Sequence, residues 1–163
     1  MAFFPCTYFE VQSQMFFYGS NYSMRDYSLK QKCEVAMARH QKLNQFYILL
    51  NKLVIICENR GLRMIIENPY TQPHYLTTYW CVKPKIIDTD RTARGDYYKK
   101  PTQYWFINFE PKQNLIFEPY DYVEIKQIAG KTVDGVGKTT ARSMIHPQYA
   151  NRFIREFILE EQE

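Results

Sequence analysis

Apolar residues recur at steps of three and four positions between residues 26 and 59. This spacing predicts one long helix from Asp26 to Asn59 with a single apolar face, and Gly61 is the residue type that commonly ends a helix. The apolar positions of that face are Val35, Ala36, Leu43, Phe46, Tyr47, Leu50, Leu53, Val54 and Cys57. A short apolar start at residues 2–4 precedes the helix, and consecutive apolar residues within Leu62–Ile66 predict a buried strand after it.

The rest of the chain alternates short apolar segments with polar or glycine-rich ones. Pro73 is placed to open a short helix that contains Leu76, Tyr79 and Trp80. The remaining expected elements are strands at Lys85–Asp88, Tyr104–Phe109 and Asp121–Ile128, loops at Asp88–Pro101 and Gly130–Lys138, and a helix from Pro147 to Glu161.

The order strand, long helix, strand, helix, strand predicts an α/β fold with a mostly parallel sheet flanked by helices. We expect a single domain over residues 1–163. In such sheets the chemistry lies at the carboxyl ends of the strands. Two expected strand ends carry reactive or polar groups: Pro5-Cys6-Thr7 follows the first strand, and Glu67-Asn68-Pro69 follows the second.

Composition narrows the class of protein. Apolar residues make up 45% and charged residues 23%, which excludes wholesale disorder. The sequence has neither an uncharged apolar run of about 18 residues nor a basic, apolar secretory start, so we expect a cytoplasmic protein that does not enter the membrane. The four cysteines form no C-x-x-C pair, which argues against a structural zinc site and favours reduced thiols.

The net charge of +4 permits contact with phosphates without requiring it. Two stretches, 83–103 and 129–142, are expected to form basic loops. The second contains Gly135-Val136-Gly137-Lys138-Thr139-Thr140, which resembles the end of a phosphate-binding loop. The first glycine of that motif would stand at position 132, where this chain has threonine, so a flexible basic loop is the better interpretation.

Cys6 and Glu67 are the candidate catalytic residues. A cysteine on a rigid turn after a strand suits a nucleophile, and a glutamate at the end of a buried strand is desolvated enough to share a proton. Each residue alone also has a structural explanation, as a small buried side chain for Cys6 and as a turn cap for Glu67.

Taken together, these two motifs resemble those of the DNA cytosine-5 methyltransferases, and most closely those of the phage-borne branch. That branch carries a Pro-Pro-Cys-Thr-Tyr type motif, then a helical stretch, then Ile-Glu-Asn-Pro. The resemblance continues in the same order over nearly the whole chain. Its further segments are Gly95-Asp96, Lys100-Pro101-Thr102, Tyr104-Trp105-Phe106-Ile107-Asn108, Ala141-Arg142-Ser143, Ile145-His146-Pro147 and Tyr149-Ala150.

The resemblance implies roles for individual residues. Cys6 would attack C6 of cytosine, Glu67 would engage the N3 edge of the flipped base, and Asn68 and Pro69 would shape the pocket. Four basic residues would contact DNA phosphates, unless they belong to an ordinary solvated loop: Arg91, Arg94, Lys99 and Lys100. Three aromatic residues could stack on the base, although core packing explains them equally well: Tyr8, Tyr70 and Trp105.

The chain also departs from the family. Phe4 stands where the phage branch usually has the first of two prolines. The family holds S-adenosylmethionine with segments that precede the cysteine motif, and this chain begins five residues before Cys6. We therefore expect a partial Rossmann-like methyltransferase sheet without its N-terminal strands, no bound cofactor unless the missing half is supplied, and no metal. An exposed first strand would favour a homo-oligomer or a hetero-complex.

Three functional hypotheses remain from these observations. The first is a degenerate methyltransferase-like module, encoded by a phage or mobile element, that binds nucleic acid or a host defence protein without catalysis. The second is a fragment or subunit of an active DNA (cytosine-5) methyltransferase with Cys6 as nucleophile. The third is a structural interaction protein that shares only ancestry with the enzymes.

Overall fold

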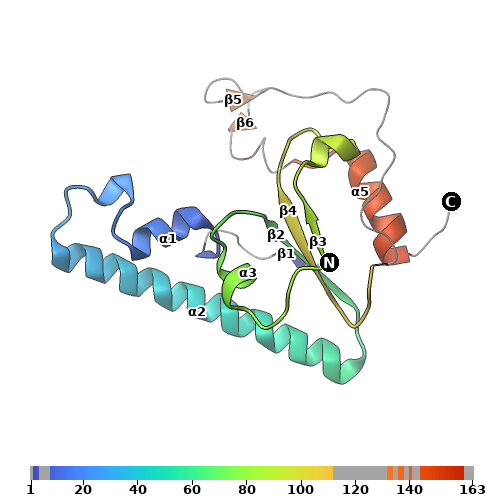
Figure 1. Cartoon of the computed structure of the whole chain (residues 1–163), viewed down its shortest axis with the longest axis horizontal. Helices are drawn as coiled ribbons and strands as arrows, with labels where there is room; N and C mark the ends of the chain where they lie inside the picture. The colour runs from blue at the N-terminus through green and yellow to red at the C-terminus, as the bar shows by residue number, and fades with distance from the viewer. Residues whose placement is uncertain are drawn as a thin grey trace. The chain divides into compact units, whose positions relative to one another are not determined.

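The computed structural model describes residues 2–3, 8–111, 132–133, 136–137, 140 and 144–159. Its elements are β1 (Ala2–Phe3), α1 (Val11–Phe17), the 3-10 turn η2 (Tyr22–Met24), α2 (Leu29–Arg60), β2 (Met64–Pro69), α3 (Tyr75–Tyr79), β3 (Ile86–Asp88), the 3-10 turn η3 (Arg91–Arg94), β4 (Thr102–Ile107), β5 (Thr132–Val133), β6 (Val136–Gly137), α5 (Pro147–Ile154) and the π-helical turn η4 (Arg155–Leu159) (Figure 1).

The chain divides into two compact units. The first contains Met1–Ile87 and Gln103–Glu110, and the second contains Asp88–Thr102 and Pro111–Glu163. The single domain expected over 1–163 stays a prediction, because compact units within one chain do not by themselves define separate domains.

The long helix α2 confirms the clearest pattern in the sequence. Ser28 caps its first turn: the Ser28 hydroxyl accepts from the Gln31 backbone N–H at 3.3 Å, and the Gln31 side chain accepts from the Ser28 N–H at 2.8 Å. This reciprocal pair explains why the helix begins three residues later than Asp26. The helix ends at Gly61, whose φ of 61° is left-handed and whose N–H bonds to the carbonyls of the last turn.

Helix α1 was not anticipated from the sequence. It lies against the first half of α2, as Figure 1 shows. The Arg39 guanidinium carbon lies 3.4 Å from the centroid of the Phe16 ring, and the Phe17 ring meets His40 edge-on at 5.8 Å. Glu10 at its start makes no side-chain capping bond, so we attribute the stability of this seven-residue helix mainly to its packing on α2.

The sheet overturns the predicted mostly parallel, Rossmann-like arrangement. Four short strands lie in the order β1-β2-β4-β3, and the β1–β2 pair is parallel. Strand β4 runs the opposite way to β2, as two side-chain hydrogen bonds show. Gln103 near the start of β4 donates to the Pro69 carbonyl at the end of β2 (3.0 Å), and Asn108 just beyond β4 donates to the Leu62 carbonyl just before β2 (2.9 Å). The sheet is therefore small and not mostly parallel.

Asn108 also closes the C-terminal end of α2. Its φ of 63° is left-handed, a conformation that asparagine tolerates better than most residues. Its side-chain amide donates to the Cys57 carbonyl in the last turn of α2 as well as to the Leu62 carbonyl, both at 2.9 Å. One side chain thus joins the end of β4 to the connection between α2 and β2.

The core of the first unit lies between α2 and the sheet. Side chains seven positions apart on α2 face inward, and they meet residues of β2, α3 and β4. The buried cluster consists of Phe9, Leu43, Leu50, Cys57, Met64, Ile66, Leu76, Trp80, Trp105 and Ile107. Trp80 is oriented by a hydrogen bond from its indole N–H to the Asn51 side chain of α2 at 3.0 Å.

Other sequence predictions are confirmed with shifted boundaries or lie outside the described residues. The strand predicted over Leu62–Ile66 runs over Met64–Pro69, so the Glu67-Asn68-Pro69 segment belongs to the strand itself. The loop predicted over Gly130–Lys138 is wrong at four positions, because β5 and β6 pair there as a small antiparallel hairpin. The strand predicted over Asp121–Ile128 lies outside the described residues. The C-terminal helix begins at Pro147 as predicted and passes into η4.

Candidate functional site at the carboxyl ends of β1 and β2

Strands β1 and β2 end at the same edge of the sheet. They pair in parallel, with Ala2 opposite Ile66 and Phe3 opposite Glu67. Cys6 follows the end of β1 by three residues in the sequence. Glu67, Asn68 and Pro69 are the last three residues of β2. Cys6, with Phe4 and Pro5, lies outside the described residues, so its predicted role as nucleophile stays a prediction.

Glu67 and Asn68 are both buried in β2. The exposed fraction of Glu67 is 8% and that of Asn68 is 0%. Two successive buried polar residues are uncommon in a short strand, because each must be hydrogen-bonded to offset its desolvation. Both side chains therefore need hydrogen-bond partners near this end of β2.

His74 supports Asn68 from the segment that follows the strand. Its Nε2 lies 3.1 Å from the Asn68 side-chain oxygen, and its Nδ1 lies 3.4 Å from the Thr77 hydroxyl. Burial lowers the pKa of His74 from 6.5 to about 4, so the imidazole is neutral at pH 7. A neutral ring has one donor and one acceptor, and the Asn68 oxygen requires that Nε2 is the donor.

Gln103 extends this buried network to β4. Its amide nitrogen donates to the Pro69 carbonyl at 3.0 Å, and its amide oxygen accepts from the Thr77 hydroxyl at 2.7 Å. The exposed fraction of Gln103 is 0%. The network therefore fixes the end of β2 to both α3 and β4, which gives Glu67, Asn68 and Pro69 a rigid wall. The sequence pattern did not reveal His74, Thr77 or Gln103, and Gln103 lies just before the strand predicted over Tyr104–Phe109.

The predicted phosphate-binding residues lie in and near η3, and the structure gives two of them partners inside the second unit. Arg91 is buried, pairs with Asp96, and has its guanidinium carbon 4.5 Å from the Tyr149 ring centroid. Arg94 donates to the buried carboxylate of Asp88 at 2.6 Å.

The two predicted lysines are placed differently from the arginines. Lys99 is 69% exposed and lies 3.6 Å from Asp90, and Lys100 is half-buried. DNA contact by these four basic residues stays a prediction. Their geometry favours Lys99 as a cation directed toward solvent and a structural role for Arg91.

The three aromatic candidates for base stacking also differ from one another. Trp105 is fully buried in the core, where its indole N–H donates to the Val82 carbonyl. Tyr8 stacks on Phe46 of α2 with ring centroids 5.4 Å apart. Tyr70, directly after β2, is half-buried, and its hydroxyl accepts from Gln72 at 2.7 Å. Of the three, Tyr70 is best placed to meet a ligand at this edge.

Two kinds of site are not found among the described residues. No group of three or more His, Cys, Asp or Glu side chains there could hold a metal ion. None of the described helices combines the length and the apolar character needed to cross a membrane.

Comparison with known proteins identifies no relative of this chain. No family model, no curated protein and no solved structure matches the chain. The candidate site therefore depends on the sequence motifs and the geometry described above.

Proposed function

We propose that this chain is a methyltransferase-like module that binds cytosine in DNA at the edge where β1 and β2 end, without transferring methyl groups on its own. The observation that carries this proposal is the parallel register of Phe3 with Glu67. That register ends β1 beside Glu67, and Cys6 follows β1 by three residues in the sequence.

The chemistry of Glu67 suits the Watson–Crick edge of cytosine. Cytosine presents a ring-nitrogen acceptor at N3 beside an amino donor at N4, and a carboxyl group can donate to the first while accepting from the second. A base reaches such a side chain only after leaving the stack, which costs a few kcal/mol and costs less for an unpaired base. The rigid wall around Asn68 and Pro69 favours binding, because the protein loses little freedom when the base enters.

Replacing Glu67 with methionine is expected to remove the preference for cytosine. We expect the unchanged protein to bind an oligonucleotide with one unpaired cytosine more tightly than the same oligonucleotide with thymine, by roughly 5- to 100-fold. Glu67→Met keeps the approximate length of the side chain but has neither a donor for N3 nor an oxygen to accept from N4, so the ratio of the two dissociation constants should fall toward one. Fluorescence anisotropy measures both constants.

Glu58→Met is the matched control, since Glu58 is an exposed residue of α2. It should leave the ratio unchanged. Equal binding of cytosine and thymine by the unchanged protein would contradict the proposal, as would methyl transfer from labelled S-adenosylmethionine by the chain alone.

The same register also favours a second candidate, in which this chain is part of a working cytosine methyltransferase. In that case the Cys6 thiolate should add to C6 of cytosine even without a methyl donor. The electron pair moves to C5, which takes a proton from water; loss of the original C5 hydrogen and expulsion of the thiolate then restore cytosine. The net result is exchange of the C5 hydrogen with solvent.

This exchange separates the two candidates. Loss of tritium from C5-labelled cytosine in DNA is expected only if Cys6 is a competent nucleophile, and Cys6→Ala should abolish it. Cys33→Ala is the control, because Cys33 is an exposed, unmodified thiol on α2. The binding module proposed first predicts no exchange above the rate in buffer.

A further inference from the structure

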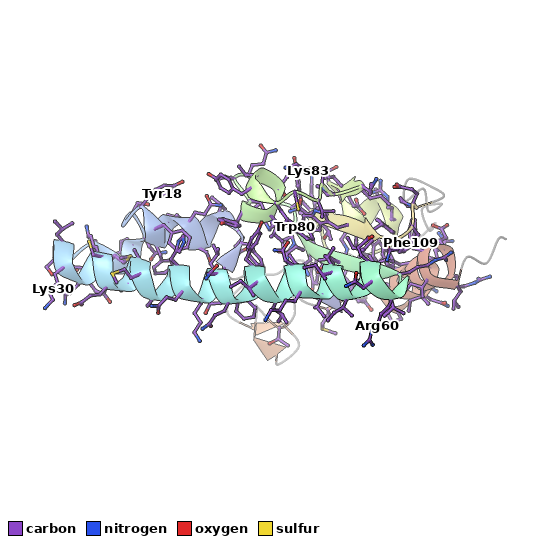
Figure 2. All side chains as sticks on the ribbon, turned by 90° about the horizontal axis from the view of Figure 1, so that it is seen from below. Tyr18, Lys30, Arg60, Trp80, Lys83 and Phe109 are labelled. Atoms are coloured by element: carbon purple, nitrogen blue, oxygen red, sulfur yellow. The ribbon has the colours of Figure 1, made fainter. Side chains whose placement is uncertain are left out.

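The turn between α1 and α2 presents three tyrosines to solvent. Tyr18 is 75% exposed, Tyr22 is 76% exposed and Tyr27 is 41% exposed. Figure 2 shows Tyr18 at the same end of α2 as Lys30, remote from Arg60 at the other end. Single exposed aromatic residues are ordinary, but here three occur within ten positions, and the segment from Tyr18 to Tyr27 is called the tyrosine turn.

The tyrosine turn is held in place by its own hydrogen bonds. Asn21 accepts from both the backbone N–H and the hydroxyl of Ser23, at 3.0 and 2.7 Å. Met24 is buried beneath the turn, and the N–H groups of Ser20 and Asn21 both bond to the Met15 carbonyl. The exposed rings are therefore carried on an ordered backbone, which lowers the entropy lost when a ligand binds.

Arg25 fixes the most exposed of these rings. Its guanidinium donates to the Tyr22 hydroxyl at 2.6 Å, and its central carbon lies 4.8 Å from the Tyr22 ring centroid. The Arg25 Nε also donates to the Asp26 carboxylate at 3.0 Å. Tyr22 consequently offers a ring in a defined orientation while three-quarters of its surface remains open to solvent.

The surroundings of the tyrosine turn are basic. Residues 15–45 contain five Lys or Arg and only two acidic residues, so this segment carries three of the four net positive charges of the chain. The Lys30 side chain is 85% exposed, and the Glu34 carboxylate lies 3.9 Å from its Nζ. Exposed aromatic rings beside cations match a single-stranded nucleic acid, whose bases stack on the rings while its phosphates meet the cations.

We infer that the tyrosine turn is a second nucleic-acid contact, at which unpaired bases stack on Tyr18 and Tyr22 and phosphates meet Arg25, Lys30 and Lys32. This inference rests on the proposed function only in taking nucleic acid as the ligand of the chain. Stacking needs no particular base, so the tyrosine turn binds single strands of any sequence, whereas the edge of the sheet at Glu67 selects cytosine. The α2 helix of 32 residues spans about 48 Å, which makes the tyrosine turn separate from the sheet end of that helix.

Binding of an oligothymidine strand tests this inference apart from the cytosine site. We expect the unchanged protein to bind it, and we expect each of Tyr18→Ala and Tyr22→Ala to weaken binding by roughly five-fold or more. The double variant Tyr18→Phe/Tyr22→Phe keeps both rings and should bind within about two-fold of the unchanged protein, since stacking uses the ring face. Changing Lys30 and Lys32 together to serine should reduce the slope of log affinity against log salt by about 0.7 per cation.

Two further variants make the result decisive. Tyr79→Ala removes an equally open ring, 68% exposed on α3, and should leave oligothymidine binding unchanged. Glu67→Met should also leave it unchanged, so failure at one site is distinguishable from failure at the other. The inference is overturned if the unchanged protein does not bind oligothymidine, if the alanine variants bind as well as the unchanged protein, or if the double phenylalanine variant loses as much affinity as either single alanine variant.

Discussion

Replacing Asp96 with alanine is expected to destabilise the second unit by about 3–5 kcal/mol. Asp96 is 2% exposed and Arg91 is 1% exposed, and the two form a buried ion pair. The Asp96 carboxylate also accepts from the backbone N–H groups of Tyr97 and His146, each at 2.8 Å. The alanine variant removes the carboxylate that neutralises the buried Arg91 guanidinium and takes the acceptor from two further N–H groups. Urea unfolding followed by circular dichroism measures the change in the free energy of unfolding.

Two other variants show whether burial causes the effect. Asp96→Asn keeps an oxygen for the two backbone donors but loses the charge, so its effect should lie between zero and that of alanine. Asp26→Ala breaks an exposed pair with Arg25, in which the Asp26 side chain is 83% exposed, and should cost no more than about 1 kcal/mol. A cost for Asp96→Ala as small as that for Asp26→Ala would show that the Arg91–Asp96 pair does not hold this unit together.

Lowering the pH from 7 to 4 is expected to reduce the free energy of unfolding through His74. Burial lowers the pKa of His74 to about 4 in the folded protein, against 6.5 for an ordinary histidine exposed to water. Between these two values the unfolded chain binds the proton more readily than the folded protein does, so stability present above pH 6.5 is lost as the pH falls toward 4. Fully expressed, this difference amounts to about 3 kcal/mol.

The contribution of His74 can be isolated by comparison with His74→Gln. The variant has no titrating group at this position, so its stability relative to the unchanged protein should improve by about 3 kcal/mol between pH 7 and pH 4. Asp88, whose pKa is raised by burial, and Asp90, whose pKa is lowered chiefly by its hydrogen bond from Thr92, titrate in both proteins and cancel in the comparison. His40→Gln is the control, because His40 is exposed on α2. A stability difference that stays constant over this pH range would refute the assignment.

The sequence predicted those elements whose formation depends mainly on residues close together in the chain. The stripe on α2 and its end at Gly61 follow from side-chain periodicity and from the left-handed conformation at that glycine. Strand β2 follows from consecutive apolar residues. Helix α1 could not be found in this way, because the contacts that hold it, Arg39 on Phe16 and His40 on Phe17, come from another helix.

The direction of the strands was predicted wrongly because the order of elements does not determine it. The parallel pairing of β1 with β2 fits the expected strand–helix–strand unit. The antiparallel course of β4 is fixed by Gln103 and Asn108, whose partners Pro69 and Leu62 are 34 and 46 positions away in the sequence. No periodicity within a segment encodes such pairings.

Only part of the candidate site was predicted, because some of its residues come together through contacts between distant segments. Glu67, Asn68 and Pro69 stand out because they interrupt or end an apolar run. His74 and Gln103 do not, since their importance arises only when α3 and β4 meet the end of β2. Arg91 was assigned to phosphate contact from its charge and from the family resemblance of its segment, and only its burial beside Asp96 and Tyr149 reveals the partners it has within the fold.

Asn108 has a consequence for how the chain folds during synthesis. The carbonyls of Cys57 and Leu62 receive its amide only after the ribosome has added more than forty further residues. Until then the junction between the long helix and the strand that follows it lacks the cross-link that joins it to the last strand of the core. Nascent chains that stall before this asparagine should therefore be cut more readily by proteases at that junction than chains that extend past it.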